Sequence, residues 1–250
     1  MAGASLSADE VRKILRAGLP QESFRGRRVL LIVPDHTRTA PVGQLFKETH
    51  AWIGPVAKEV NVMVALGTHP PMSQEAICHR LDLTPEQKAK DYPKVKLLNH
   101  AWDNDQTLAE IGKIPASEIR DLTGGLFERE VKVRINRAAL EYDELVILGP
   151  TFPHEVVGFS GGNKYLFPGI SGPEVLNFFH WLGAVVTNPG IIGKKWTPVR
   201  KVVDRAASMV KTRKWCASMV VRSDASLAGL HVGTPESAWD KAADQSAGLH

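Results

Sequence analysis

Two histidines and a lysine surround a glycine-rich turn in the middle of the chain. His154 precedes the turn Gly158-Phe-Ser-Gly-Gly162, Lys164 follows it, and His180 comes further along. The pair Gly161-Gly162 allows the backbone to take positive φ angles and to approach a ligand closely. Imidazoles can accept and donate protons near neutral pH. The segment therefore predicts a ligand-binding loop, but not a P-loop, because the P-loop spacing and the Ser or Thr after the lysine are missing.

Two earlier clusters of polar residues could also bind ligands or move protons. Asp35-His-Thr-Arg38 combines an acid, an imidazole, a hydroxyl and a guanidinium, and Gly67-Thr-His69 is followed by two prolines that prevent a helix from starting there. Plainer interpretations exist. Asp35 could simply pair with Arg38 across a turn, Lys164 could be a solvated charge, and His180, which lies between aromatic residues, could be a packed core histidine.

Each of the three clusters follows a short apolar run that is typical of a buried strand. These runs cover residues 28–33, 61–66 and 144–149. Parallel strands place their carboxyl ends at one edge of the sheet, where open α/β sheets bind ligands. We therefore expect the three clusters to meet in one pocket.

The elements between these strands read mainly as helices. Capping-box spacings predict helix starts at Ser7-Ala-Asp-Glu10, Thr84-Pro-Glu-Gln87 and Ser171-Gly-Pro-Glu174. The other expected elements are helices over 41–53, 73–81 and 198–211, strands over 94–98 and 216–221, a half-exposed strand over 130–135 within an insertion, and a polar end. The alternation predicts one α/β domain over residues 1–250, a doubly wound, mostly parallel Rossmann-like sheet with helices on both faces.

Composition limits the classes of function. The 250 residues are 43% hydrophobic and 23% charged, as in a soluble globular protein, and the net charge is +4. The 31 basic and 27 acidic residues are interspersed, so we expect a small anionic ligand and no nucleic acid. Cys78 and Cys216 lie too far apart to indicate a zinc ribbon or a disulfide framework. Without a signal peptide or an 18-residue apolar run, we expect a cytoplasmic protein that does not bind membranes.

Taken together, the polar clusters resemble the amino-terminal half of the nickel-dependent lactate racemase family. The similarity covers about residues 28–190, and its most specific part is the third block, Pro153-His154 followed by Gly158-Phe-Ser-Gly-Gly-x-Lys164, Pro168-Gly169 and His180. There are departures, since Asn163 stands where arginine is common and Thr39 where proline is frequent. Family members also have a carboxyl-terminal domain that closes the cleft. The resemblance leaves three expectations open, namely that this domain is a separate polypeptide, that the chain is a fragment, or that it is a divergent single-domain relative.

The resemblance implies a cofactor and a role for each candidate residue. The cofactor is a nickel pincer nucleotide, pyridinium-3-thioamide-5-thiocarboxylic acid mononucleotide, which would be attached to Lys164 with nickel bound by His180. His69 and His154 would act as acid and base, and Arg38 would bind the substrate carboxylate. The other residues expected at the cofactor are Ser160, Gly161, Gly162, Asp35 and Thr37.

The implied function is a 2-hydroxyacid racemase or epimerase that works by reversible hydride transfer to the cofactor. Its expected partners are a small 2-hydroxy acid, the cofactor-maturation enzymes and a separate carboxyl-terminal domain. Two other hypotheses remain open. One is an accessory protein that binds the nucleotide or nickel without turnover, and the other is a zinc hydrolase or lyase that uses His69, His154 and His180.

Overall fold

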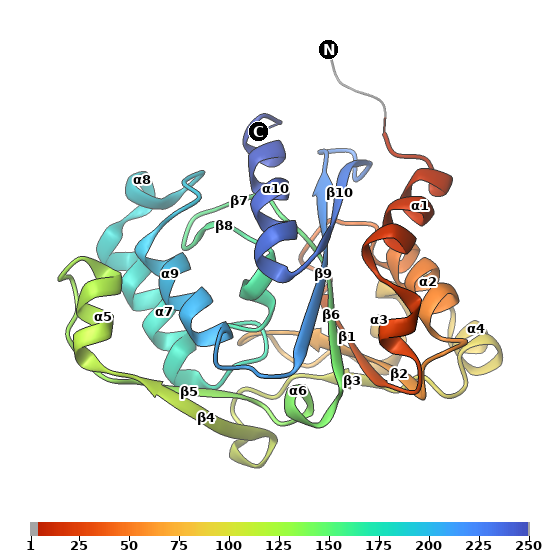
Figure 1. The fold of residues 1–250 in the computed structure, drawn as a ribbon, viewed down its shortest axis with the longest axis horizontal. Coiled ribbons are helices and arrows are strands. Elements are labelled where there is room, and N and C mark those ends of the chain that lie inside the picture. Colours follow the sequence, from red (N-terminus) through yellow and green to blue (C-terminus); the bar gives the residue numbers. More distant parts are fainter. Residues whose placement is uncertain (1–4, 250) are drawn as a thin grey trace.

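The computed structural model describes residues 5–249, which form a six-stranded sheet with helices on both faces (Figure 1). The strand order is β10-β9-β6-β1-β2-β3, and all neighbours are parallel except β10 and β9. The strands are β1 (Arg28–Pro34), β2 (Glu59–Ala65), β3 (Leu97–Asn99), β6 (Glu144–Pro150), β9 (Arg213–Val221) and β10 (Leu227–Gly233). The predicted fold class is confirmed.

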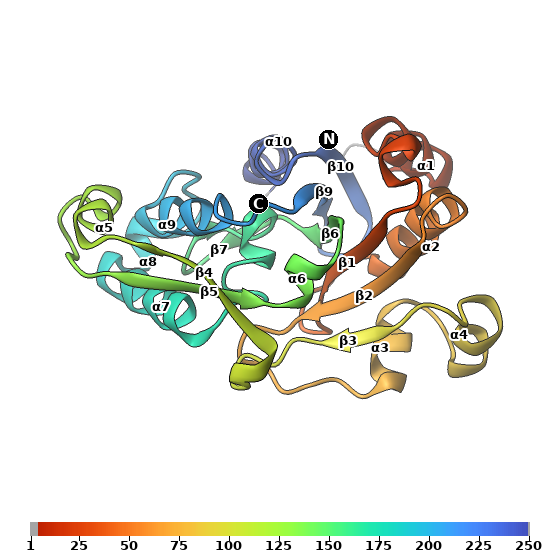
Figure 2. The ribbon, with the colours of Figure 1, turned by 60° about the horizontal axis from the view of Figure 1, so that its bottom comes forward.

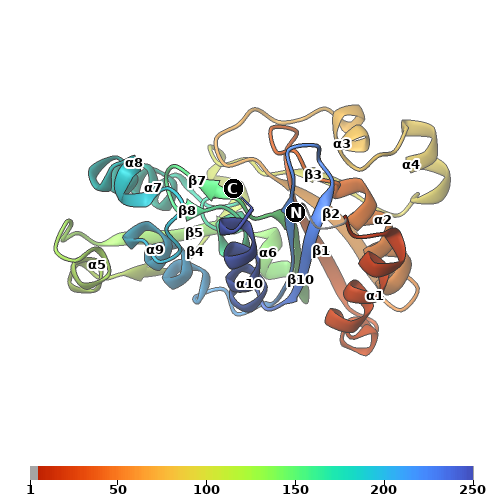
Figure 3. The same ribbon diagram turned by 90° about the horizontal axis from the view of Figure 1, so that it is seen from above.

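Alternating side chains of β1 supply two hydrophobic cores, one on each face of the sheet. Leu31 belongs to one core, and Leu30 and Ile32 belong to the other. Seen from above, the helices of the two cores lie on opposite sides of the sheet (Figure 3). The first core is covered by α1 (Ala8–Gly18), α2 (Val42–Ile53) and α3 (Gln74–Arg80), and the second by α5 (Ala116–Thr123), α7 (Pro173–Val186) and α9 (Pro198–Ala207).

The insertion contains a separate two-stranded antiparallel ribbon. It consists of β4 (Leu108–Ile114) and β5 (Val131–Asn136), and Figure 2 shows it as an arm beside the main sheet with α5 at its far end. Val131, Val133 and Ile135 are buried in the second core, where β5 packs on α7, while Lys132 is exposed, so the predicted half-exposed strand is confirmed. The expected strand over 94–98 is shorter and later, at β3.

Two of the three predicted capping boxes are present. Ser7 and Glu10 form one at α1, and Thr84 with Gln87 forms the other at α4 (Pro85–Asp91). The third prediction is wrong, because α7 begins at Pro173 with no side-chain cap. Its expected partner, Glu174, instead pairs with Arg134 of β5 at 2.7 Å. A charged guanidinium within reach is a stronger hydrogen-bond donor than a backbone amide.

The carboxyl-terminal end, which the sequence predicted only to be polar, is a regular part of the fold. It contributes strand β10 and helix α10 (Pro235–Ala247), which packs on β9, β10 and the turn η3 (Gly162–Tyr165). The buried face of α10 consists largely of alanines around Trp239. Small side chains form a weak apolar stripe, and this explains why the sequence pattern did not predict the helix.

The remaining elements are short. They are η1 (Gln21–Phe24), η2 (Asp105–Thr107), α6 (Ala138–Glu141), β7 (Pro153–His154), β8 (Gly158–Phe159) and α8 (Asn188–Ile191). Between residues 5 and 249, none of the helices combines the length and the hydrophobicity needed to cross a bilayer. Residues 1–4, on which the signal-peptide argument partly rests, lie outside the described residues.

Candidate active site

A cavity of about 220 Å³ lies at the carboxyl ends of β1, β2 and β6. Its wall comes from the loops after β1 and β2, the glycine turn and one side of α7. The predicted site residues in this wall are Asp35, Arg38, His69, His154, Ser160, Gly161, Lys164 and His180. Two predicted cofactor contacts, Thr37 and Gly162, do not line it. The three polar clusters thus meet in one pocket, as the parallel strand ends require.

Asp35 and His69 form a pair across the ends of two neighbouring strands. The buried Asp35 carboxylate accepts a short hydrogen bond from Nδ1 of His69 and further bonds from the amide and hydroxyl of Thr37, at 3.1 and 2.6 Å. Burial alone would raise the pKa of Asp35, but the bonds from Thr37 and His69 outweigh it and hold the pKa below 3.8. Asp35 therefore fixes the His69 proton on Nδ1 and leaves Nε2 free as a base.

Asp35 does not pair with Arg38, so the plainer interpretation of that turn is wrong. The Arg38 guanidinium instead lies over the ring of Phe152, 5.7 Å from its centroid. Among residues 5–249 it forms no ion pair with a carboxylate. An uncompensated guanidinium in the cavity wall is suited to binding a carboxylate or a phosphate.

His154 is buried, and its Nδ1 is a hydrogen-bond acceptor, whereas Nδ1 of His69 is a donor. Its Nδ1 accepts a hydrogen bond from the amide of Val156 at 3.1 Å, so the proton of the neutral ring is on Nε2. Burial, followed by the charges of Lys164 and Arg38, lowers the pKa of His154 to about 2. With Nδ1 engaged by its own loop, Nε2 is the nitrogen left for a ligand.

Lys164 offers an amine that is largely uncommitted. Its Nζ lies 5.8 Å from the centroid of the Phe179 ring, and within the described chain it has no hydrogen-bonding or ion-pair partner. Burial and the charges of Arg38 and Arg200 lower the pKa of Lys164 to about 7. A substantial fraction of this amine is neutral at physiological pH, which is the form that can act as a nucleophile.

His180 is exposed at the edge of the cavity and is not a packed core histidine. Partial burial and the charge of Lys164 lower its pKa below 6.5. Over residues 5–249, no three His, Cys, Asp or Glu side chains lie close enough together to hold a metal ion. A metal bound by His180 would therefore need ligands from a bound group.

Glycine is needed at positions 161 and 162 of the turn for different structural reasons. Both adopt positive φ, +84° at Gly161 and +57° at Gly162. A side chain at Gly161 would collide with the hydroxyl of Thr151, and one at Gly162 would lie 2.8 Å from Cβ of Trp239. The absent side chain of Gly161, which lines the cavity, makes room for Thr151, while that of Gly162 lets helix α10 approach the turn.

A family model described as the lactate racemase N-terminal domain matches residues 8–190 of this chain. The chain belongs to this family. It is 26% identical over 175 residues to a lactate racemase from Lactiplantibacillus plantarum and 29% identical over 161 residues to one from Thermoanaerobacterium thermosaccharolyticum. The matched regions are 68% and 62% of this chain but only 36% and 33% of those proteins.

Solved structures extend the fold similarity of this lactate racemase N-terminal domain beyond residue 190. The match to a crystal structure of a protein from Thermotoga maritima covers 100% of this chain and 61% of that protein's chain, with 29% identity and a TM-score of 0.88. The match to the lactate racemase apoprotein from T. thermosaccharolyticum covers 95% of this chain and 54% of that protein's chain, with 21% identity and a TM-score of 0.74. The segment after residue 190 therefore has a counterpart in both folds.

Arg80 supports the loop after β1, a role that the sequence did not predict. It comes from α3, and its guanidinium donates to the carbonyls of Pro34, Arg38 and Ala40 at 3.2, 2.7 and 3.4 Å. These contacts hold the loop that presents Asp35. An arginine in the last turn of a helix usually interacts with that helix's own end, so no sequence signal marks this role.

His100 lies at the end of β3 and outside the cavity wall. Its Nε2 bonds the carbonyl of Ser171 at 3.0 Å, and its Nδ1 lies 3.2 Å from the side-chain amide of Asn136. Burial lowers the pKa of His100 to about 4. This histidine connects the end of β3 to the segment that leads into α7.

Proposed function

We propose that the protein is a 2-hydroxyacid racemase or epimerase whose cofactor, a nickel pincer nucleotide, is attached to Lys164. One observation carries the proposal. His69 and His154, in complementary hydrogen-bonding states, line the same cavity as the uncommitted Lys164 amine and Arg38. The family membership of residues 8–190 supports the racemase class.

The residues present fit such a cofactor. Lys164 provides a partly neutral amine for covalent attachment, and Arg38 provides a charge for a phosphate or carboxylate. His180 provides one imidazole for nickel, and the sulfur and carbon donors of the pincer would supply the other ligands. When bound, this group supplies the capacity to accept and return the carbon-bound hydrogen of the substrate as hydride, which no side chain can do.

The side chains of this chain would bind the acid and move its hydroxyl proton. Arg38 holds the substrate carboxylate, and Nε2 of His69 accepts the hydroxyl proton while Asp35 stabilises the imidazolium that forms. His154 serves the opposite enantiomer. Its Nε2 already carries the ring proton, so a second proton must go on Nδ1, which the bond from the Val156 amide and the charges of Lys164 and Arg38 oppose in the free protein.

Attachment and substrate binding would remove the electrostatic part of that opposition. An acylated Lys164 has no charge, and a carboxylate bound to Arg38 neutralises its effect. Both changes would favour the imidazolium of His154, which acts as an acid once Nδ1 is released from the Val156 amide. The two histidines can then exchange roles between the two directions of reaction.

The test is the interconversion of enantiomers. Protein matured with the cofactor-maturation enzymes is incubated with single enantiomers of lactate and larger 2-hydroxy acids, and the products are separated by chiral chromatography. We expect His69→Gln and His154→Gln to lose at least about 100-fold in kcat. His36→Gln is the matched control, because His36 is exposed in the same loop as Asp35 and does not line the cavity.

The outcome separates the proposal from its alternatives. A covalent adduct without interconversion of any acid would contradict the racemase and favour an accessory binder. A zinc hydrolase is disfavoured, because the described side chains do not form a three-ligand cluster.

A further inference from the structure

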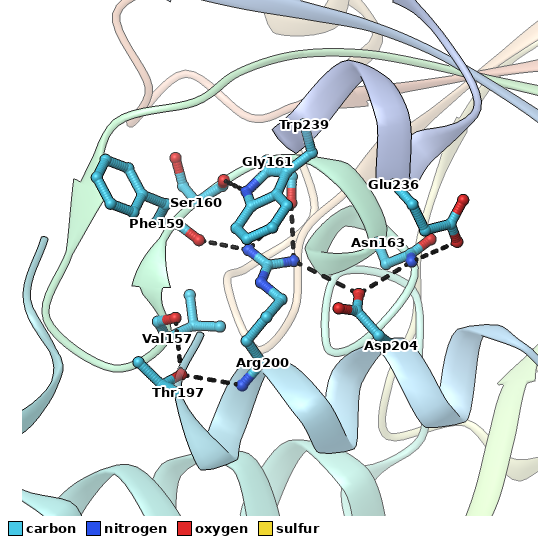
Figure 4. A network of polar contacts seen from close by, with 10 residues as sticks. All are labelled: Val157, Phe159, Ser160, Gly161, Asn163, Thr197, Arg200, Asp204, Glu236 and Trp239. Carbon is cyan, nitrogen blue, oxygen red and sulfur yellow. Dashed lines mark hydrogen bonds and ion pairs between the residues drawn. The ribbon is translucent and has the colours of Figure 1, made fainter. Parts of the chain in front are cut away.

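Arg200 of α9 is buried completely beneath the glycine turn (Figure 4). Its nearest carboxylate, on Asp204, is 3.9 Å away, which is a long ion pair. A buried guanidinium is costly unless its hydrogen-bonding capacity and charge are compensated. The contacts that compensate Arg200 therefore indicate what it holds in place.

Those contacts are made with the glycine turn. The guanidinium donates to the carbonyl of Phe159 in a short hydrogen bond and to the carbonyl of Gly161 at 3.4 Å. It stacks on the ring of Trp239 from α10, 4.1 Å from the centroid. The indole Nε1 of Trp239 in turn donates to the carbonyl of Ser160 at 2.8 Å. Three consecutive carbonyls are held by two side chains that pack on each other, as Figure 4 shows.

The same carbonyls are connected to the cavity wall. The carbonyl of Gly161 also accepts the backbone amide of Lys164 at 3.2 Å, and the amide of Ser160 donates to Phe152 at 2.9 Å. Any rotation of the peptide at Gly161 would move Lys164. By fixing the carbonyl of Gly161, Arg200 therefore also fixes the position of Lys164.

A second group of polar contacts fixes the other side of the turn. The side-chain amide of the buried Asn163 donates to Asp204 at 3.0 Å and to Glu236 of α10 at 2.9 Å. Asn163 thus connects the turn to both α9 and α10, the two helices that supply Arg200 and Trp239. Both helices lie beyond residue 190, where the family match ends.

We infer that Arg200 and Trp239 are positioning residues that hold the glycine turn so that Ser160, Gly161 and Lys164 keep their places in the cavity wall. The inference rests on the proposed function of Lys164 as the attachment point. Arg200 is suited to this role because its planar fork can hold two carbonyls at once, whereas a lysine ammonium is a point charge on a flexible stem.

The experiment measures amide hydrogen exchange, by mass spectrometry, in the cofactor-free protein. We expect Arg200→Lys to speed exchange of the amides of residues 160 and 164 by at least about tenfold, because charge-assisted bonds to the turn are lost. Trp239→Phe keeps the stacking ring and removes only the donor to Ser160, so we expect about a fivefold increase at the same amides. Exchange in α9 and β9 should remain unchanged.

Arg213→Lys is the matched control. Arg213 also stacks on a tryptophan, Trp215 at 5.5 Å, and bonds Glu144, but it lies at the opposite end of the sheet. We expect this variant to leave exchange at residues 160 and 164 unchanged. An equal increase in the control, or an increase in Arg200→Lys spread evenly over α9 and β9, would show a merely structural role and overturn the inference.

Two further outcomes are decisive. If Arg200→Lys does not fold, unchanged exchange in a folded Trp239→Phe overturns the inference, and a local increase supports it. The fraction of protein that carries the Lys164 adduct after maturation is measured in parallel. Absence of the adduct in the unmodified sequence contradicts the proposed function alone, whereas the exchange result tests the positioning role without any cofactor.

Discussion

At the residue level, the protonation of His154 is governed by its burial and by the cations beside it. Lys164 and Arg38 both lower its pKa, in addition to burial. We expect Lys164→Met to raise the pKa of His154 from about 2, because removing a positive charge favours the imidazolium. Imidazole nitrogen shifts followed by NMR across a pH titration measure this. An unchanged or lower pKa would contradict the coupling between the two groups.

Asp35 makes a separate prediction about His69. Asp35→Asn removes the carboxylate that fixes the Nδ1 proton and stabilises the imidazolium, so we expect kcat to fall about 100-fold with little change in KM. The control is Asp143→Asn, since Asp143 pairs with Arg28 at the opposite end of β1. Steady-state racemisation kinetics measure both variants. Equal losses in the two would refute the role of Asp35.

The sequence indicated most of the cavity residues but could not orient them. Polar clusters after buried strands located Asp35, His69 and His154, because parallel strand ends must share an edge. Within a loop, however, spacing does not tell which side chain turns inward. Thr37 bonds Asp35 from outside the cavity wall, and Gly162 faces α10.

At the level of elements, the contact between the glycine turn and α10 should depend on the missing side chain of Gly162. We expect Gly162→Ala to destabilise the protein by about 2 to 3 kcal/mol, from positive φ and from the clash with Trp239. The matched control is Gly124→Ala, at φ +65° with open space around its Cβ, which should cost only about 1 kcal/mol. Urea unfolding measures both, and equal costs would argue against tight packing of α10 on the turn.

Local signals predicted elements where nothing distant competed with them. The capping boxes at Ser7 and Thr84 formed because their partners are their own helix amides. The box at Ser171 failed because Glu174 reaches Arg134 on another element. Tertiary contacts of this kind are invisible to spacing arguments.

At the level of the whole molecule, the segment after residue 190 is integral to the fold. Strand β10 forms one edge of the sheet, and α10 buries Trp239 and several alanines. We expect a chain truncated after residue 233 to lose at least about 4 kcal/mol of unfolding free energy, the usual cost of losing one buried tryptophan. Urea unfolding followed by circular dichroism measures this. A midpoint equal to that of the full chain would show that α10 is dispensable.

The alternation of strands and helices was sufficient to predict the doubly wound sheet, because its buried strands appear in the sequence as short, continuous apolar runs, such as those over 28–33, 61–66 and 144–149. It also predicted α9 and β9, but it was not sufficient for β10 and α10, where an Ala-rich helix face buries little surface per residue. Trp239 belongs to α10, and Arg200 belongs to the predicted helix α9. Their role at the glycine turn becomes visible only when α9 and α10 are placed against it.

The central claim is that Lys164 is the attachment point of the cofactor, and intact-mass analysis tests it most directly. The protein, Lys164→Ala and the exposed control Lys194→Ala are each produced with the cofactor-maturation enzymes. We predict a covalent mass increase in the unmodified protein and in Lys194→Ala, and none in Lys164→Ala. An adduct that persists in Lys164→Ala, or is missing from the unmodified protein, would contradict the account.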